Sequence, residues 1–127
     1  MKITNGQILG FLNSNIASKN LPVKLAYAIA ANIEAVKPAL EAYNRQRTDL
    51  IEKYAKKDEE GKPIAENGNY VFEDPEGWSS GISELLEAEA EVSVTTVPIE
   101  LLEKCDTDDF DSLNVADLSA INFMISD

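Results

Sequence analysis

Histidine is absent from this chain of 127 residues, and cysteine occurs only once, as Cys105. Nucleophilic catalysis by a serine or a cysteine needs a neighbouring base, which is usually histidine, so the composition argues against this class of enzyme. A single cysteine cannot form a disulfide within the chain, and nothing in the sequence therefore indicates an oxidising compartment.

Long hydrophobic runs and glycine-rich loops are missing as well. No apolar stretch approaches the roughly 18 residues that a membrane span requires, and the N-terminal residues lack the apolar core of a secretory signal. The glycines are scattered instead of forming a phosphate-binding loop, and no pattern marks one pair of acids as catalytic. We expect a cytoplasmic protein that is not an enzyme, binds no cofactor or metal and does not associate with membranes.

Basic residues are scarce in the second half of the chain, which makes the charge uneven. Residues 1–57 contain nine Lys or Arg against four acids, whereas residues 58–127 contain two lysines against nineteen acids. The formal charges of the two parts are therefore +5 and −17, which give the net charge of −12. Such a split favours solubility, docking of one part on the other, or head-to-tail association of copies. Repulsion between carboxylates and phosphates disfavours direct binding of a nucleic-acid backbone by the acidic part.

Residues 21–57 have the apolar spacing of one long helix. Their large side chains recur every three or four positions, as in the a and d positions of a heptad, and alanines fill much of the rest. Pro22 suits a first turn, but Pro38 would lie in the interior, where it removes a hydrogen bond and clashes with the carbonyl of Glu34. Either the helix kinks near Val36 or two helices meet there, and we expect the kink because the spacing continues across Pro38. The seam consists of Leu25, Ile29, Ile33, Val36, Leu40, Tyr43, Arg47, Leu50 and Tyr54.

A helix of this length would span about 50 Å at 1.5 Å per residue, which is more than a small core covers. The seam therefore packs inside the chain, or it binds a protein partner or a second copy. Arg47 is the one charged seam residue, and it either sets the register with a partner or reaches solvent along its aliphatic stem. The candidate binding residues of the distal seam are Leu40, Tyr43, Arg47, Leu50 and Tyr54.

The flanking residues predict shorter elements. Residues 4–18 have one apolar face and a cap at Thr4 or Asn5, so we expect a helix that packs antiparallel to the long one. Asn67 and Gly68 predict a type I′ β-hairpin, which the alternating residues 91–97 would join as a strand. The aromatic side chains near this hairpin either seal it or form a contact patch; they are Tyr70, Phe72 and Trp78.

Two further helices are predicted in the acidic part. Asp74 is followed by Pro75, which suits the cap and first turn of an amphipathic helix that extends to about residue 90. Asn114 or Ser112 would cap a last helix, whose inward-facing residues are Val115, Leu118, Ile121 and Met124 or Ile125. The sequence thus predicts one mainly α domain of the α+β class over residues 1–127. Residues 1–57 would form a basic helical hairpin with a long kinked helix, and residues 58–127 an acidic part with a small β-hairpin or strand cap.

The segment between residues 105 and 113 is crowded with carboxylates. An EF-hand loop that started at Asp106 would place Phe110 at a ligand position and Asp117 where a glutamate belongs, so the spacing does not indicate a calcium site. We expect a solvated loop whose carboxylates are candidate contacts for a basic partner surface. These candidates are Asp106, Asp108, Asp109 and Asp111.

Five short segments stand out as a set: residues 2–7, 21–24, 53–61, 66–70 and 84–92. They read KITNGQ, LPVK, KYAKKDEEG, ENGNY and ELLEAEAEV. Together they resemble a family of small proteins of unknown function from phages and prophages of Gram-positive bacteria, over most of the chain to about Val97. The resemblance implies a phage or prophage origin and a place in the host cytoplasm during infection or lysogeny. It supplies no catalytic residues.

Two functional hypotheses follow. The first is a non-enzymatic interaction or accessory protein, which offers its apolar seam to a partner from the phage or the host. The second is an acidic inhibitor of a host defence or nucleic-acid-binding protein, which would act partly by imitating nucleic-acid charge. The seam favours the first hypothesis, and the charge of residues 58–127 favours the second.

Overall fold

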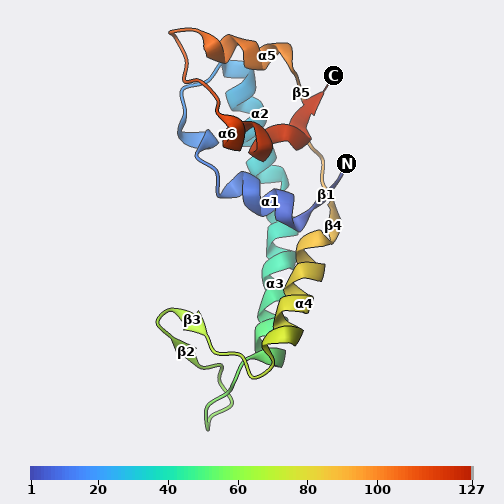
Figure 1. The fold of residues 1–127 in the computed structure, drawn as a ribbon. Coiled ribbons are helices and arrows are strands. Elements are labelled where there is room, and N and C mark those ends of the chain that lie inside the picture. Colours follow the sequence, from blue (N-terminus) through green and yellow to red (C-terminus); the bar gives the residue numbers. More distant parts are fainter. Residues whose placement is uncertain (127) are drawn as a thin grey trace.

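The computed structural model describes residues 1–126 and shows a mostly helical α+β protein with small pairs of strands. The molecule is elongated, with a head at one end of a stalk of two helices (Figure 1). We call residues 1–36 and 92–126 the head and residues 55–74 the tip. The head helices are α1 (Asn5–Leu12), α2 (Val23–Ala35), α5 (Glu100–Glu103) and α6 (Val115–Ile121). The stalk helices are α3 (Lys37–Tyr54) and α4 (Pro75–Glu87).

The N-terminal helix is capped as predicted but is shorter than predicted. The backbone N–H of Gln7 donates to Thr4 Oγ1 at 3.1 Å, and the backbone N–H of Thr4 donates to Gln7 Oε1 at 2.8 Å. This reciprocal capping box satisfies two of the first-turn donors. The α-helix ends at Leu12, and the 3₁₀-helix η1 (Ile16–Ser18) follows. Ser14 Oγ donates to the carbonyl of Phe11 at 2.6 Å, a local bond that competes with continued helix.

The predicted long helix is divided at Val36 into α2 and α3, where we expected a kink within one helix. Pro38 is the second residue of α3 and has no N–H to donate to the carbonyl of Glu34. Bonding resumes around it, since the N–H of Val36 donates to Asn32 O at 3.1 Å and that of Leu40 donates to Val36 O at 2.9 Å. The break lies at the junction of head and stalk.

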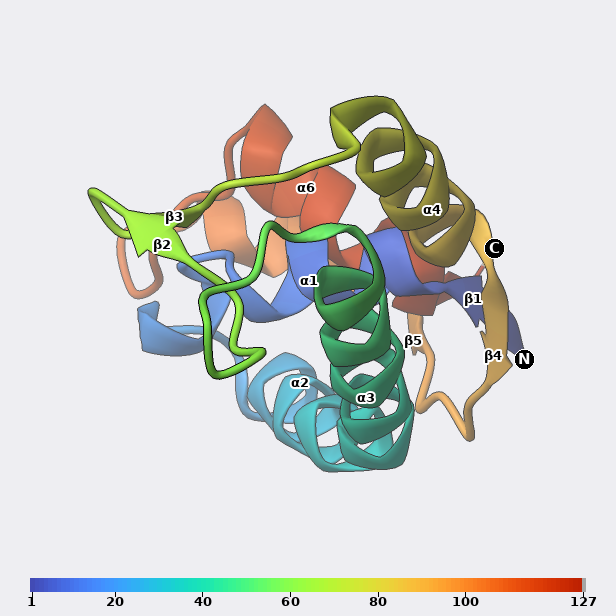
Figure 2. The same ribbon diagram turned by 90° about the horizontal axis from the view of Figure 1, so that it is seen from below.

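The helix that lies alongside α3 is α4, not the N-terminal helix (Figure 1, Figure 2). The two run antiparallel, so that Gly77 and Gly81 of α4 face Tyr54 and Leu50 of α3. These glycines allow a close approach, because a Cβ on Gly81 would lie 2.9 Å from Leu50 Cδ2. The short α1 instead packs across the junction, where it contacts α3, α4 and α6. The predicted antiparallel pairing of residues 4–18 with the long helix is therefore wrong.

The tip is a small extended unit that reverses the chain between α3 and α4. Strands β2 (Ala65–Glu66) and β3 (Asn69–Tyr70) pair antiparallel. Asn67 and Gly68 both have positive φ, at 52° and 82°, as a type I′ turn requires. The rings of Phe72 and Trp78 stack at 4.5 Å between centroids, which joins the end of the tip to the first turns of α4.

The predicted strand over residues 91–97 does not join this hairpin. Strand β4 (Glu89–Glu91) pairs antiparallel with β1 (Lys2–Thr4), and β5 (Val97–Pro98) pairs parallel with β6 (Ile125–Ser126). The chain between β4 and β5 has the buried side chain of Asn32 in place of a strand partner. Its Oδ1 accepts from Thr95 N at 2.7 Å, and its Nδ2 donates to Thr95 O at 2.9 Å. The segment is therefore held along α2.

The main hydrophobic core lies in the head and draws on both charge halves of the chain. Phe11, Leu25 and Ile29 from the basic half pack in one cluster with Leu101 and Met124 from the acidic half. A second cluster fills the junction of head and stalk; it consists of Ile3, Ile8, Val36 and Val92. On α4, by contrast, no residue is fully buried. The stalk is thus stabilised mainly by the interface between α3 and α4, and α1 packs on both helices at the junction.

The last helix is capped by Asn114 as predicted, through a capping box with Asp117. Ile121 and Met124 are buried. Met124 belongs to the 3₁₀-helix η3 (Asn122–Met124), which follows α6. The inward orientation predicted for Val115 and Leu118 is wrong, because their side chains are 80% and 41% exposed. The helix has only seven residues, and its C-terminal end supplies the core contacts.

We predict that Gly77→Ala destabilises the protein by about 1–3 kcal/mol, because the new methyl group would overpack the helix pair. A Cβ at this position would lie 2.5 Å from Tyr54 Cε1 and would also clash with Asp74. The matched control is Gly10→Ala in α1, where a Cβ meets no atom within 4 Å. It should stabilise by about 0.5–1 kcal/mol through helix propensity. Urea unfolding measures both, and equal effects of the two substitutions would contradict the close approach.

Candidate interaction surface

The seam residues of α3 lie along the stalk. Those toward its distal end pack against other residues of the same chain. Leu50 and Tyr54 are half-buried and pack against the glycines of α4. Tyr43 is buried and lines a shallow hollow of about 360 Å³ between α3 and the C-terminal end of α4. Leu40 is half-buried, and Ile51 beside the seam is buried. These side chains therefore stabilise the stalk from within.

Arg47 is the exception among the predicted seam residues. Its side chain is exposed, and no carboxylate oxygen of residues 1–126 lies within 4.0 Å of its guanidinium. It projects from the stalk into solvent, as expected for a residue at which the seam has left the core.

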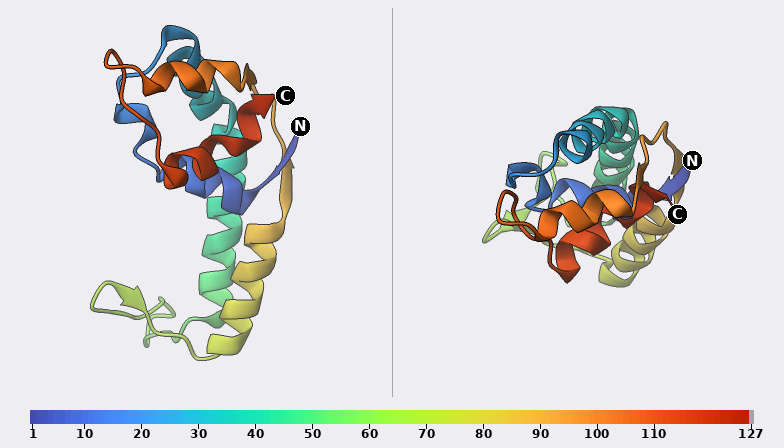
Figure 3. Two further views of the ribbon diagram at one scale, coloured as in Figure 1. Left: turned by 45° about the horizontal axis from the view of Figure 1, so that its top comes forward. Right: turned by 90° about the horizontal axis from the view of Figure 1, so that it is seen from above.

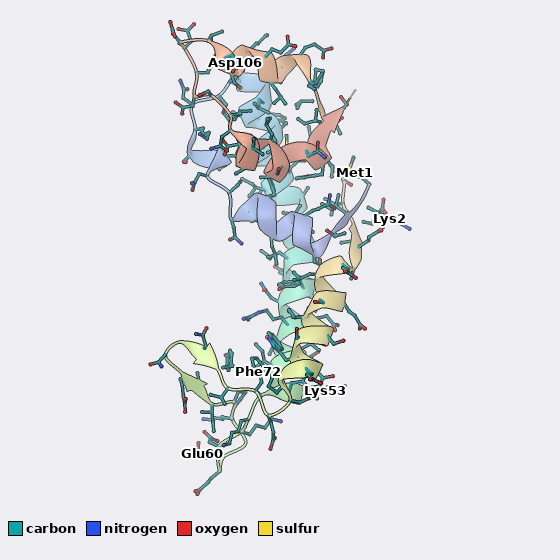
Figure 4. All side chains as sticks on the ribbon, viewed as in Figure 1. Met1, Lys2, Lys53, Glu60, Phe72 and Asp106 are labelled. Atoms are coloured by element: carbon teal, nitrogen blue, oxygen red, sulfur yellow. The ribbon has the colours of Figure 1, made fainter. Side chains whose placement is uncertain are left out.

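The predicted acidic loop lies at the far end of the head from the stalk, where Figure 4 labels Asp106. Asp111 anchors it: its Oδ2 accepts from the backbone N–H of Asn20 at 2.7 Å, and its own N–H donates to Asn20 O at 2.9 Å. Asn20 Nδ2 donates to the carbonyl of Asp109 at 2.8 Å. The side chains of Asp106, Asp108 and Asp109 remain exposed. Within residues 1–126, no three His, Cys, Asp or Glu side chains are grouped so as to hold a metal ion.

The structure also brings together an apolar surface that the sequence analysis did not identify. Val23 and Tyr27 of α2 are 84% and 71% exposed, and Ile99 is 54% exposed. Together with Leu118 of α6, they surround the short helix α5. We call this set of four side chains the apolar head face.

Two hollows in this face lie on opposite sides of α5. The first, of about 410 Å³, is formed between α2 and the start of α5, with Val23, Tyr27, Val97, Pro98 and Leu101 in its lining. The second, of about 280 Å³, lies toward α6. Its lining comprises Ile99, Leu102, Leu113 and Leu118 together with Glu103, Cys105 and Asp106. Seen from above, α5 crosses the head between α2 and α6 (Figure 3, right).

The helical repeat explains why α5 serves both hollows. Leu101 and Leu102 are successive residues of α5 and project about 100° apart around the helix axis, so Leu101 lines the first hollow and Leu102 lines the second. In the sequence, the available signal was Tyr27, a large aromatic residue that lies off the apolar seam and would therefore face water. Leu118 carried no such signal, because its spacing resembles that of a core position.

Acidic side chains border the second hollow. Glu103 and Asp106 line it, and no Lys or Arg nitrogen of residues 1–126 lies within 4.0 Å of either carboxylate. Cys105 forms part of its floor and is buried. Burial raises the pKa of the Cys105 thiol above its ordinary value of 9.0, and the negative charge of Asp106 raises it further.

No protein family, curated protein or solved structure matches this chain. The helices of residues 1–126 include none with both the length and the apolar character to cross a membrane.

We predict that Leu50→Asp destabilises the protein by on the order of 2 kcal/mol, because it places a charge in the α3–α4 interface. Arg47→Ala, one turn away and exposed, is the control and should change stability by less than about 0.5 kcal/mol. Urea unfolding gives the stability, and sedimentation gives the oligomeric state. A Leu50→Asp variant that loses an oligomer but keeps its stability would instead assign the seam to an interface between chains.

We also predict that Cys105 makes stability fall as the solution becomes alkaline. The thiol ionises near pH 9 in the unfolded chain but at higher pH in the folded one, so the unfolded state binds fewer protons there. The contribution of the protonated thiol to the free energy of unfolding is complete below pH 9.0. It is lost as the pH rises toward the pKa of the thiol in the folded state. Urea unfolding between about pH 8 and about pH 10 should show a steeper decline for the natural chain than for Cys105→Ala. Parallel slopes would refute it.

Proposed function

We propose that this chain is a non-enzymatic interaction protein that binds a protein partner through the apolar head face. The observation that carries the proposal is the exposure of Val23, Tyr27 and Ile99 around two open hollows. Large contiguous apolar patches are uncommon on monomeric soluble proteins and mark interaction sites. Aromatic residues such as Tyr27 are also enriched at the centres of such interfaces.

The contrast with the stalk supports this choice of surface. Leu50 and Tyr54 already have partners within the chain, since they pack on Gly81 and Gly77. The exposed residues of the head face have no such cover within residues 1–126, and they surround hollows into which a side chain fits. Burying Val23 and Tyr27 against a partner would remove more apolar area from water than burying the half-covered residues of α3.

The chemistry of the hollows supports a binding role over a catalytic one. The one cysteine in either lining is Cys105, and the pKa of its thiol is raised rather than lowered. A reactive cysteine needs the thiolate, which a lowered pKa provides. The acids beside it bring negative charge, which disfavours the thiolate further.

As part of this proposal we assign the protein to a phage or prophage and to the cytoplasm of its bacterial host. The partner is then a protein of the phage or of the host, or a second copy of this chain. The resemblance of residues 2–97 to small phage proteins supports the origin, and the negative charge of residues 58–127 suits a soluble accessory factor.

A second candidate function is inhibition of a basic host protein. It rests on the exposed carboxylates of α5 and the loop that follows, where Lys104 is the single cation among residues 100–111. Such a surface would occupy a basic cleft that normally holds nucleic acid. Under this alternative, association should slow steeply as salt screens the charges.

The test uses a photo-reactive amino acid in place of Tyr27 or Ile99 in the full-length protein, expressed in the infected host. Both positions should crosslink to the same protein, because both belong to one surface. The control position is Asn44 on the exposed side of α3, which should yield no crosslink to that protein. Equal crosslinking from Asn44, or none from either head position, would contradict the proposal.

A further inference from the structure

We infer that the second hollow receives a basic side chain, so that the partner segment is amphipathic and basic. This inference rests on the proposed function and specifies the chemistry of its binding site. It joins the two candidate functions, because the same surface combines apolar and acidic contacts.

The composition of the hollow carries the argument. Four aliphatic side chains form its walls, and two carboxylates, those of Glu103 and Asp106, stand among them. Both residues are exposed, so a purely apolar ligand seated in the hollow would displace water from these carboxylates without supplying a counter-charge, which costs free energy. An arginine or lysine side chain matches both features, since its methylene stem packs on aliphatic groups while its charged end reaches an acid.

The state of the two carboxylates points the same way. Neither has a cation within 4.0 Å among residues 1–126, whereas Asp117 of the same region is paired with Lys19 at 3.4 Å. Exposed Glu100, Asp108 and Asp109 add to the negative potential around the hollow. The site therefore attracts a cation that residues 1–126 do not supply within ion-pair distance. Arginine suits it better than lysine, because its planar guanidinium can pair bidentately with a carboxylate and is more weakly hydrated.

The first hollow indicates the second feature of the expected ligand, which is an apolar side chain. Its lining is mostly apolar and fits an apolar anchor, although it also includes the polar residues Lys24, Thr95 and Thr96. Residues of α5 line both hollows, since Leu101 belongs to the first and Leu102 to the second. A partner segment that crosses α5 would place an apolar side chain on one side and a basic side chain on the other, as an amphipathic segment does.

A random peptide library provides the probe for this inference. Peptides are selected on the immobilised full-length protein, and those that also bind the Glu103→Gln/Asp106→Asn variant are removed. The remaining peptides should be enriched in arginine or lysine beside leucine, phenylalanine or tyrosine. Their dissociation constants should rise at least about tenfold on that variant, because a charge-assisted contact is lost. Leu118→Ser should weaken binding in the same way through the wall of the hollow.

The matched control is Asp108→Asn/Asp109→Asn, which removes the same charge from exposed side chains outside the hollow. It should change the dissociation constants by no more than about threefold, as expected for screened surface charges. Equal losses on both double variants would overturn the inference, because they would indicate general charge attraction. Selected peptides without basic residues would also overturn it. Circular dichroism and urea unfolding confirm that each variant is folded.

Failure of this inference is distinguishable from failure of the proposed function. If crosslinks from Tyr27 and Ile99 capture one partner but no hollow-dependent basic peptide is selected, the head binds a protein by different chemistry. If basic peptides depend on the hollow but neither head position crosslinks to a protein in the host, the inference on chemistry holds and the proposed function fails.

Discussion

The arrangement of this molecule depends on a single missing hydrogen-bond donor. Pro38 cannot bond to the carbonyl of Glu34, so the apolar seam of residues 21–57 is divided at Val36 instead of continuing as one helix. The buried side chain of Val36 then lies in the cluster that joins head and stalk. Above this point α2 contributes to the main core, and below it α3 is covered on one side by α4. The division thus separates a packed head from a stalk that is held mainly by the pairing of α3 with α4.

The sequence predicted the features that depend on neighbouring residues. The caps at Thr4, Asp74 and Asn114 and the positive-φ turn at Asn67 and Gly68 are all present, because each is set within a few positions. Long-range pairing was not predictable in the same way. The association of α4 with α3 depends on Gly77 and Gly81, which look like ordinary helix-weakening residues until their neighbours are known. The course of residues 92–97 depends on the side chain of Asn32, a polar residue next to an apolar seam.

The distinction between local and long-range features also explains which parts of the candidate site could be predicted from the sequence. The acidic residues of the loop after Cys105 were apparent from composition, and their exposure follows from charge. The apolar head face was not apparent, since two members come from α2, Ile99 precedes α5 and Leu118 comes from α6, so that they lie far apart in the sequence. Ile99 and Leu118 carry no local signal that separates them from core residues. Only the fold places them beside Glu103 and Asp106, where apolar and charged groups line one hollow.

In terms of chain topology, residues 37–91 are an insertion into the head. They comprise the stalk, the tip and strand β4. Head segments from both sides of this insertion must meet before the main core can form, which requires closing a long loop with a substantial loss of entropy. The antiparallel pairing of α3 with α4 brings the ends of this insertion together, and contacts near the tip such as that of Tyr54 with Gly77 join residues closer in sequence than those that close the head. A chain that forms this helical pair early lowers the entropy still to be lost when the head closes, and therefore reaches the folded state faster.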